Sequence, residues 1–523
     1  MLKLSPLADT APLALEAAYE HAPYLKRLSD QRIECVETIR AKGADAAFAM
    51  ALDLMKRAGE NTSLDTAMPM LRHAKRGAHL AIAAADLSGA WSLAEVIGAM
   101  TRLADVAVSS ALRVALKTRG LKSAGLFVTA LGKMGAGELN YSSDIDLAAF
   151  YDPEVFDGGS RAPGDAASRV LKDVVRMLES RTPDGYVFRT DLRLRPDPRS
   201  TPLAVSTQMA ETYYESIGQN WERMVWIKAR ACVGDLDVAE AFHKMMQPFV
   251  WRKHLDYWAI DDIHSIKRMI NASKGDLSLL DPAADVKLGP GGIREIEFFV
   301  QTQQLILGGR NDALRDRKTL IALAALNESG IVDDPVAADL QAAYCALRNV
   351  EHRIQMIADE QTHTLPADAS KRLHVARLCG YSSLDDFDMD LLALRRTVNG
   401  HYRDLFAGSE AADSESELAG NLVFTGVDDD PGTLETLSGL GFENPSRVIE
   451  TIREWHRGNT PATRTQRGQQ LLTALLPALL KSMAETGEPD TAFMRFADFF
   501  SHLKSGVQTL SMLQAEPDLL ADL

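Results

Sequence analysis

Two aspartates one residue apart, Asp144 and Asp146, are the residues of this sequence whose types and spacing best suit chemistry. Because a β-strand points alternate side chains to the same face, both carboxylates would project together, about 6 to 7 Å apart. Two like charges so placed need a positive partner. No histidine or cysteine stands beside them, so the pattern favours a hard, oxygen-seeking cation such as Mg²⁺, which usually brings a phosphate with it.

The segment before the aspartates, residues 132–143, is rich in glycine and reads GKMGAGELNYSS. It follows a short β-type run at 125–131, and its backbone N–H groups and serine hydroxyls could bind phosphate oxygens. It is not a Walker loop, because Lys133 precedes most of the glycines. Taken alone, the glycine-rich turn and the Asp-x-Asp pair are both common at turns and strand ends.

A second alternating run, residues 187–195, reads VFRTDLRLR and predicts a strand. One face would carry apolar side chains, and the other would carry Arg189, Asp191, Arg193 and Arg195. Asp191 is the natural third carboxylate for a cage around one or two Mg²⁺ ions, and Arg193 and Arg195 would add donors for a phosphate. A solvated strand face explains the two arginines equally well.

The elements that must position these residues lie in a chain of 523 residues, which is long enough for three or four domains. The formal charge of -15 argues against a general nucleic-acid binder, because phosphate contacts need clustered lysine and arginine. The four scattered cysteines are typical of reduced thiols. Neither a signal peptide nor an apolar stretch of membrane-spanning length is evident, so we expect a cytoplasmic protein with no membrane or nucleic-acid partner.

The order of these motifs, with a strand, a glycine-rich turn, Asp-x-Asp on the next strand and a later aspartate, resembles that of the DNA polymerase β-like nucleotidyltransferases. Longer motifs narrow the resemblance to the glutamine synthetase adenylyltransferase family. They are 132–147, TDLRLRP at 190–196, WER at 221–223, IKAR at 227–230, KLGPGGIREIEF at 287–298 and DEQTHTLP at 359–366. The similarity extends over essentially the whole chain.

The resemblance implies an α+β fold that is mostly α overall, with a polymerase β-like nucleotidyltransferase domain and extensive flanking helical domains. Helical spacing, β-type runs and an acidic linker candidate at 408–417 suggest the boundaries. We predict four parts, which are an N-terminal helical region (1–117), the nucleotidyltransferase domain (118–235), a helical domain (236–407), and a linker with a central or regulatory helical region (408–523).

The family's enzyme has two nucleotidyltransferase halves joined by a helical region. The sequence LNYSSD at 139–144 and the N-terminal position of the motif resemble the adenylyl-removing half. That half removes AMP from a tyrosine of glutamine synthetase by phosphorolysis, with phosphate consumed and ADP released. No second copy of the motif follows, so we expect a fragment of a longer protein. The alternatives are forward adenylyl transfer from ATP, and a regulatory module that docks glutamine synthetase or a PII signalling protein.

The resemblance also implies roles for individual residues. Asp144, Asp146 and Asp191 would hold Mg²⁺ or Mn²⁺. The phosphate ligands that it implies are Gly132, Ser142, Ser143, Arg193 and Arg195. Lys228 is predicted from its own helical face, which it shares with Trp221 and which could bring it to the nucleotide, although a surface lysine explains it as well. The implied partners are glutamine synthetase as the substrate, PII in its uridylylated form, and glutamine as a possible effector.

Two other motifs have interpretations that rest on their residues alone. Residues 428–430 repeat the Asp-x-Asp spacing before Pro-Gly, and this stretch is predicted to be a solvated loop. In the 289–297 segment the glycines favour a structural role, with Arg294 and Glu297 as candidates to reach the cleft.

Overall fold

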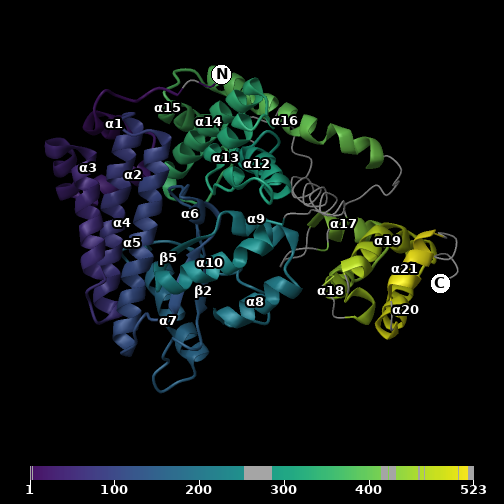
Figure 1. The fold of residues 1–523 in the computed structure, drawn as a ribbon. Coiled ribbons are helices and arrows are strands. Elements are labelled where there is room, and N and C mark those ends of the chain that lie inside the picture. The colour runs from purple at the N-terminus through teal and green to yellow at the C-terminus, as the bar shows by residue number, and fades with distance from the viewer. Residues whose placement is uncertain are drawn as a thin grey trace. The chain divides into compact units, whose positions relative to one another are not determined.

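The computed structural model describes residues 2, 4–252, 285–413, 422, 424, 431–456, 460–464, 466–503 and 506–515. These residues form two compact units (Figure 1). The first unit contains the described residues up to 252 together with 285–405, and the second contains those that follow. The two predicted helical regions that flank the catalytic domain therefore share one unit with it as far as residue 405.

Five helices open the first unit: α1 (Ala11–Ala18), α2 (Pro23–Gln31), α3 (Ile33–Ala58), α4 (Leu64–Leu87) and α5 (Leu93–Arg119). Figure 1 shows α3, α4 and α5 side by side, and α4 packs against both of the others. Alanine fills much of α4, whose residues 77–87 are all buried, so its neighbours can approach closely. A capping box between Ser92 and Glu95 starts α5, and Gly120 in the left-handed conformation ends it. The predicted helical character of this region is confirmed.

A small mixed sheet follows, made of β1 (Leu126–Ala130), β2 (Ile145–Tyr151), β3 (Thr190–Asp191), β4 (Ala204–Ser206) and β5 (Arg230–Gly234). Its strand order is β3-β2-β1-β5. β3 pairs with the first residues of β2, and β4 pairs with the last three residues of the same strand. β1 is antiparallel to β2 and β5, whereas β3 and β4 run parallel to β2. The predicted β-type run at 125–131 is confirmed as β1, and the strand expected for the Asp-x-Asp pair is confirmed as β2, although Asp144 lies just before its first residue.

The predicted strand over 187–195 is wrong for most of its length, because only Thr190 and Asp191 pair with β2. The chain turns after them instead of continuing. The Asp191 carboxylate accepts the backbone N–H of Arg193, and the Arg195 guanidinium donates to the carbonyls of Leu192, Pro198, Thr201 and Pro202. The alternation of residue types is typical of a strand, but hydrogen bonds between these side chains and the nearby backbone produce a loop.

The two faces of the sheet are covered by different helices. On β1, Val128 shares a core with α5 and with α7 (Pro163–Glu179), whereas Phe127 contacts Phe242 of α10 (Leu236–Val250), with ring centroids 5.7 Å apart. Phe150 of β2 joins this second cluster at 4.8 Å from Phe242. The period-2 alternation of strand side chains accounts for this division. Because α10 packs on the sheet, the sheet layer extends past the predicted boundary at residue 235.

Short helices connect the strands: α6 (Gly132–Ala136), α8 (Thr207–Ser216) and α9 (Asn220–Ile227). The rest of the first unit is helical, with α12 (Ile293–Leu307), η1 (Asp312–Leu314), α13 (Thr319–Glu328), α14 (Asp334–Ala358), α15 (Ala369–Leu378) and α16 (Leu384–Asp413) around a separate apolar core. Helix α16 runs into the predicted linker, so 408–413 is helical. Residues 414–417 and the predicted loop at 428–430 lie outside the described residues.

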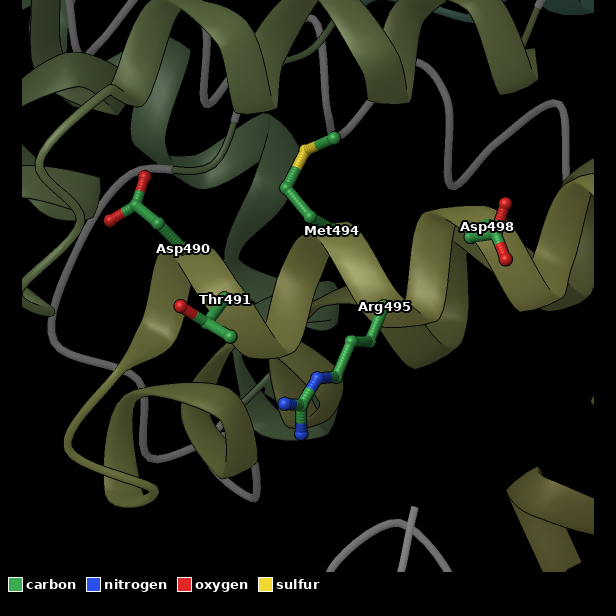
Figure 2. A pocket seen from close by; sticks show the side chains of 5 residues that line it. All are labelled: Asp490, Thr491, Met494, Arg495 and Asp498. Atoms are coloured by element: carbon green, nitrogen blue, oxygen red, sulfur yellow. The ribbon is translucent and has the colours of Figure 1, made fainter.

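The second unit consists of α17 (Pro431–Gly439), α18 (Pro445–His456), η2 (Pro461–Thr463), α19 (Gln466–Glu485), α20 (Pro489–His502) and α21 (Gly506–Ala515). Trp455, Phe493 and Phe500 lie in its core. An open pocket of about 610 Å³ lies along α20, lined by Asp490, Thr491, Met494, Arg495 and Asp498 (Figure 2).

The described residues therefore form an α-rich α+β protein with one small mixed sheet. Among them, no helix has the length and apolar character that crossing a membrane requires.

Candidate active site

The three predicted metal-binding aspartates meet at one end of the sheet. Asp144 directly precedes β2, and Asp146 is the second residue of that strand. Asp191 ends β3, and the parallel register pairs it with Asp146. Neighbouring strands lie about 4.8 Å apart, so the carboxylates of Asp146 and Asp191 belong to adjacent positions on the sheet.

The electrostatics of Asp146 show that the other two carboxylates are close. Burial, together with the negative charges of Asp144 and Asp191, raises the pKa of Asp146 to about 7, against the opposing effect of Lys287 and Arg193. A group in this state is half protonated near neutral pH, and a bound cation would favour its ionised form. Burial also acts to raise the pKa of Asp191, but hydrogen bonds from Arg193 outweigh it and lower that pKa.

The donor set fits a hard divalent cation, because it supplies carboxylate oxygens whose mutual repulsion a cation would relieve. Among the described residues, however, no three Asp, Glu, His or Cys side chains are already arranged as a set of metal ligands. Arg193 accounts for this at Asp191, since its guanidinium Nη2 lies 2.8 Å from Asp191 Oδ2 and its Nε lies 3.2 and 3.1 Å from Oδ1 and Oδ2. A cation bound by Asp144 and Asp146 would compete with Arg193 for Asp191.

Gly132 lies directly against Asp146. Its backbone has φ +52°, and a Cβ added there would come within 2.2 Å of Asp146 Oδ2. Glycine is therefore needed at this turn for two reasons, its left-handed backbone and the close approach of the carboxylate. Gly135 is under a similar restriction, because its Cβ would meet the Lys228 carbonyl oxygen at 2.1 Å. The first turn of the glycine-rich segment is thus placed beside the predicted metal ligands.

Ser142 is buried, and its polar groups are occupied by other parts of the protein. Its backbone N–H donates to Gln355 Oε1 over 2.9 Å, and its hydroxyl donates to the Asp359 carboxylate. Arg189 donates to its carbonyl oxygen. This placement differs from the predicted role of Ser142 as a phosphate ligand. Ser143 is only half-buried and directly precedes Asp144.

The two predicted arginines have different surroundings. Arg193 lies at the aspartates, and its side chain is 62% exposed, so it can reach a ligand in solution. Arg195 donates to four backbone carbonyls of the loop that follows β3, and burial lowers its pKa. Arg195 therefore holds the loop together, and Arg193 is the arginine that the structure brings to the carboxylates.

Lys228 lies in a buried group of charged residues. Its ammonium is 2.8 Å from Glu297 Oε1 and 3.6 Å from Glu138 Oε2. Burial acts against the charge on Lys228, but the two glutamates outweigh it and raise its pKa. The interpretation of Lys228 as a surface lysine is wrong, because it is 6% exposed. Glu297, a candidate to reach the cleft, is its ion-pair partner.

Comparison with known proteins gives this arrangement a context. Residues 3–245 match the model of the glutamate-ammonia ligase adenylyltransferase family. A curated bifunctional glutamine synthetase adenylyltransferase/adenylyl-removing enzyme from Caulobacter vibrioides is 48% identical over 98% of this chain and 53% of its own length. Its counterpart from Rhizobium meliloti is 44% identical over 98% of this chain and 54% of its own length. The chain belongs to the glutamine synthetase adenylyltransferase family.

The chain spans about half the length of the curated family relatives that it matches. Residues 264–406 match a second family model, described as GlnD PII-uridylyltransferase. This second match begins after α10 and includes α12 to α15, which are helices of the first unit that surround their own apolar core. The resemblance inferred from the sequence motifs is confirmed.

The family motifs contain residues near the site that sequence reasoning left without a role. Lys287, from the 287–298 motif, favours the charged form of Asp146. Its loop is held firmly, since the Asp285 carboxylate accepts the backbone N–H groups of Lys287 and Leu288 over 2.8 and 2.7 Å. Asp359, from the 359–366 motif, binds Ser142. The sequence did offer a signal for Lys287 and Asp359. Both are charged residues inside long family motifs that the nucleotidyltransferase pattern leaves without a role.

Proposed function

We propose that this chain carries a nucleotidyltransferase site that removes AMP from an adenylylated tyrosine of glutamine synthetase by phosphorolysis. The observation that carries this proposal is the parallel pairing of Asp146 with Asp191, with Asp144 two residues away on the same edge. The glycine-rich turn between β1 and β2 supports a polymerase β-like nucleotidyltransferase domain. The names of the relatives, which include adenylyl removal, point to the same chemistry.

In this proposal Asp144, Asp146 and Asp191 hold Mg²⁺ or Mn²⁺. When bound, the cation would neutralise charge on the phosphates and help to align them. Gly132 has no side chain, so the Asp146 carboxylate can lie directly against the turn, and the backbone N–H groups of this turn would be available to a phosphate beside it. Arg193, once turned from Asp191, would donate two parallel hydrogen bonds to a phosphate.

The reaction balances without any oxidant or further co-reactant. An oxygen of inorganic phosphate attacks the phosphorus of the tyrosine-bound AMP, and the bond from that phosphorus to the tyrosine oxygen breaks. The proton of the attacking phosphate ends on the tyrosine oxygen, and the new phosphorus–oxygen bond makes ADP. Such a transfer depends on positioning and charge more than on a strong base.

Two alternatives have their own discriminating products. Forward transfer from ATP to the tyrosine would release pyrophosphate, whereas removal consumes phosphate and releases ADP. A module that only docks glutamine synthetase or a PII protein would release neither. The intact aspartate set with a pKa-perturbed member supports an enzyme, because perturbed carboxylates gather where catalysis or ion binding needs them.

The partners proposed from the family resemblance are glutamine synthetase as protein substrate, a PII protein in its uridylylated form, and glutamine as an effector. The match of residues 264–406 to a family described by PII uridylylation is consistent with a PII-linked role for this region. We also propose that the protein works in the cytoplasm, where glutamine synthetase and nucleotides are available.

The test is to incubate the chain with adenylylated glutamine synthetase, phosphate and Mg²⁺, and to measure ADP. Asp144→Asn and Asp146→Asn should each abolish turnover and leave binding of glutamine synthetase intact, because the substitution removes only a charge. Unchanged turnover in either variant would contradict the catalytic assignment. ADP formation that does not depend on added phosphate would contradict phosphorolysis.

A further inference from the structure

Helix α14 presents a row of polar side chains toward the glycine-rich segment. The row comprises Arg348, Glu351 and Gln355, together with Asp359, which directly follows the last residue of the helix. Their spacing of three or four residues puts all of them on one helix face. The first three are completely buried. A buried polar row of this kind must be matched by partners, because unpaired polar groups in the interior cost free energy.

The partners of the row follow one another along the glycine-rich segment. The Lys133 ammonium donates to both carboxylate oxygens of Glu351, at 2.9 and 3.1 Å. Arg348 donates to Asn140 and to the carbonyl of Glu138. Helix α14 therefore holds the segment between Gly132 and the aspartates at several points.

The last contact in the series is made to Ser142, two residues before Asp144. Gln355 accepts the Ser142 backbone N–H over 2.9 Å, and Asp359 accepts its hydroxyl. Arg189, which precedes β3, donates to the Ser142 carbonyl. All three polar groups of Ser142 are thus held from outside the segment. The position of the chain as it enters Asp144 is set by these contacts.

The backbone at Asp359 indicates that its carboxylate is needed there. Asp359 has φ +58°, in the left-handed region, where a residue with a side chain is strained relative to glycine. Glycine would end the helix more easily. The carboxylate is used twice instead, because it also accepts the Lys75 ammonium over 2.7 Å, and only 10% of the Asp359 side chain is exposed. Its two oxygens tie α4 and Ser142 to the end of α14.

We propose that Gln355 and Asp359 are positioning residues that fix Asp144 through Ser142, and that the end of α14 thereby sets the affinity of the carboxylate site for a divalent cation. The inference rests on the proposed function in taking Asp144 and Asp146 as cation ligands. It assigns to the 359–366 motif a role in the site, and it makes metal binding depend, through Ser142, on the helical region that contains α14. Groups that orient metal ligands typically contribute about 10-fold to 100-fold to affinity.

The experiment measures Mn²⁺ binding to the full chain by the electron paramagnetic resonance signal of free Mn²⁺, without any turnover. Two variants at one position separate the hydrogen bond to Ser142 from the ion pair with Lys75. Asp359→Gly removes the carboxylate and relieves the backbone, so it should raise the Mn²⁺ dissociation constant by about 10-fold or more. Asp359→Asn keeps an oxygen for the Ser142 hydroxyl and loses the charge that pairs with Lys75, so it should lower thermal stability while it keeps affinity within about 2-fold.

Ser142→Ala provides a second variant, since it removes the same hydrogen bond from the other side. Combined with Asp359→Gly, it should add nothing further to the loss of affinity, because both changes break one contact. The matched control is Asp388→Asn, which breaks the ion pair between Asp388 and Arg372 (3.0 Å) within the helical region. This control should lower the melting temperature and leave Mn²⁺ affinity unchanged.

The outcomes separate the two proposals. If Asp359→Gly and Ser142→Ala bind Mn²⁺ like the unchanged chain while Asp146→Asn does not bind it, the positioning role is wrong and the metal site stands. If Asp146→Asn also binds normally, the proposed site itself is wrong. If Asp388→Asn weakens Mn²⁺ binding as much as Asp359→Gly does, the effect is a general loss of stability and the positioning role is overturned.

Discussion

At the scale of single residues, the site depends on the close contact between Asp146 and Gly132, which is possible only because glycine has no side chain. Gly132 combines a left-handed backbone with a carboxylate oxygen of Asp146 at the place where a Cβ would stand. The same aspartate has its pKa raised to about 7, by burial first and then by its two acidic neighbours. Small displacements at this point would change both the geometry and the charge of the ligand set.

Gly132→Ala should therefore lower turnover by about 100-fold, because the new methyl group must displace Asp146. Gly98→Ala is the matched control, since Gly98 lies in α5 and, apart from its chain neighbours and the nearby backbone of that helix, no atom lies within 4 Å of the place that an added methyl group would take. That change should raise the free energy of unfolding by about 0.5 to 1 kcal/mol and leave turnover unchanged. The measurements are ADP release and urea unfolding, and equal activity of the two variants would disprove the role of Gly132.

The two arginines after β3 should respond differently to substitution. Arg193→Ala should reduce turnover by about 100-fold with a change in unfolding free energy of less than about 0.5 kcal/mol, because its side chain is exposed beside the carboxylates. Arg195→Ala should cost about 1 to 3 kcal/mol of stability, because four backbone carbonyls lose a donor. Thermal melting and kinetics on the same samples test this. A loss of stability in the Arg193 variant as large as in the Arg195 variant would contradict the division of roles.

At the scale of elements, the packing on the sheet includes a half-buried histidine. His243 of α10 lies 2.9 Å through Nε2 from the Thr129 hydroxyl of β1, and burial, with a contribution from Arg317, lowers its pKa to about 4. In the unfolded chain a histidine titrates near pH 6.5. As the pH falls from about 6.5 to about 4, the unfolded state therefore binds a proton that the folded state does not, and stability is lost over that window.

His243→Gln keeps a polar group that can reach Thr129 but does not titrate. The variant should lose stability less steeply than the unchanged chain between about pH 6.5 and 4, by up to one proton in the linkage slope. Urea unfolding at a series of pH values measures the slope. Identical slopes for the two proteins would show that His243 does not titrate differently on folding.

How far the elements could be predicted from the sequence depended on where the controlling contacts lie. The helices up to residue 117 and the strands around Val128 and Asp146 follow from residue periodicity, because burial on a neighbouring layer imposes it. The strand predicted from Val187 to Arg195 was wrong for most of its length, because side chains of this segment bond to its own backbone and turn the chain after Asp191. These contacts are local in the structure but leave no mark on the alternation of residue types.

The site was predictable to a similar extent. The three aspartates and Gly132 were chosen from spacing and family motifs, and the structure places them near one another, while their roles as ligands stay a prediction. Ser142 and Lys228 were assigned to phosphate or nucleotide, but the structure occupies them with Gln355, Asp359 and Glu297. Their partners lie more than 60 residues away in sequence, and such pairings cannot be read from local pattern.

At the scale of the whole molecule, the described residues divide into two units with separate apolar cores, and the aspartates lie in the first. Ligands of the site should therefore stabilise one unit only. A cation at about 100 times its dissociation constant adds about 2.7 kcal/mol, which corresponds to a rise of roughly 3 °C for a unit of this size. Scanning calorimetry should show this rise in one transition, with the other unmoved.

Asp146→Asn is the control for the calorimetry, because it removes a ligand charge without changing either core. The cation should produce no rise in this variant. If both transitions of the unchanged chain moved together, or if the variant responded like the unchanged chain, the cation would be binding elsewhere.

The most direct test of phosphorolysis at the aspartate site follows the phosphate itself. The chain is incubated with adenylylated glutamine synthetase, Mg²⁺ and ³²P-labelled inorganic phosphate, and the products are separated. The account predicts label in the β-phosphate of ADP in proportion to the unmodified tyrosine formed, and no label with Asp146→Asn. Release of unlabelled AMP, or labelled ADP formed equally by the Asp146 variant, would contradict it.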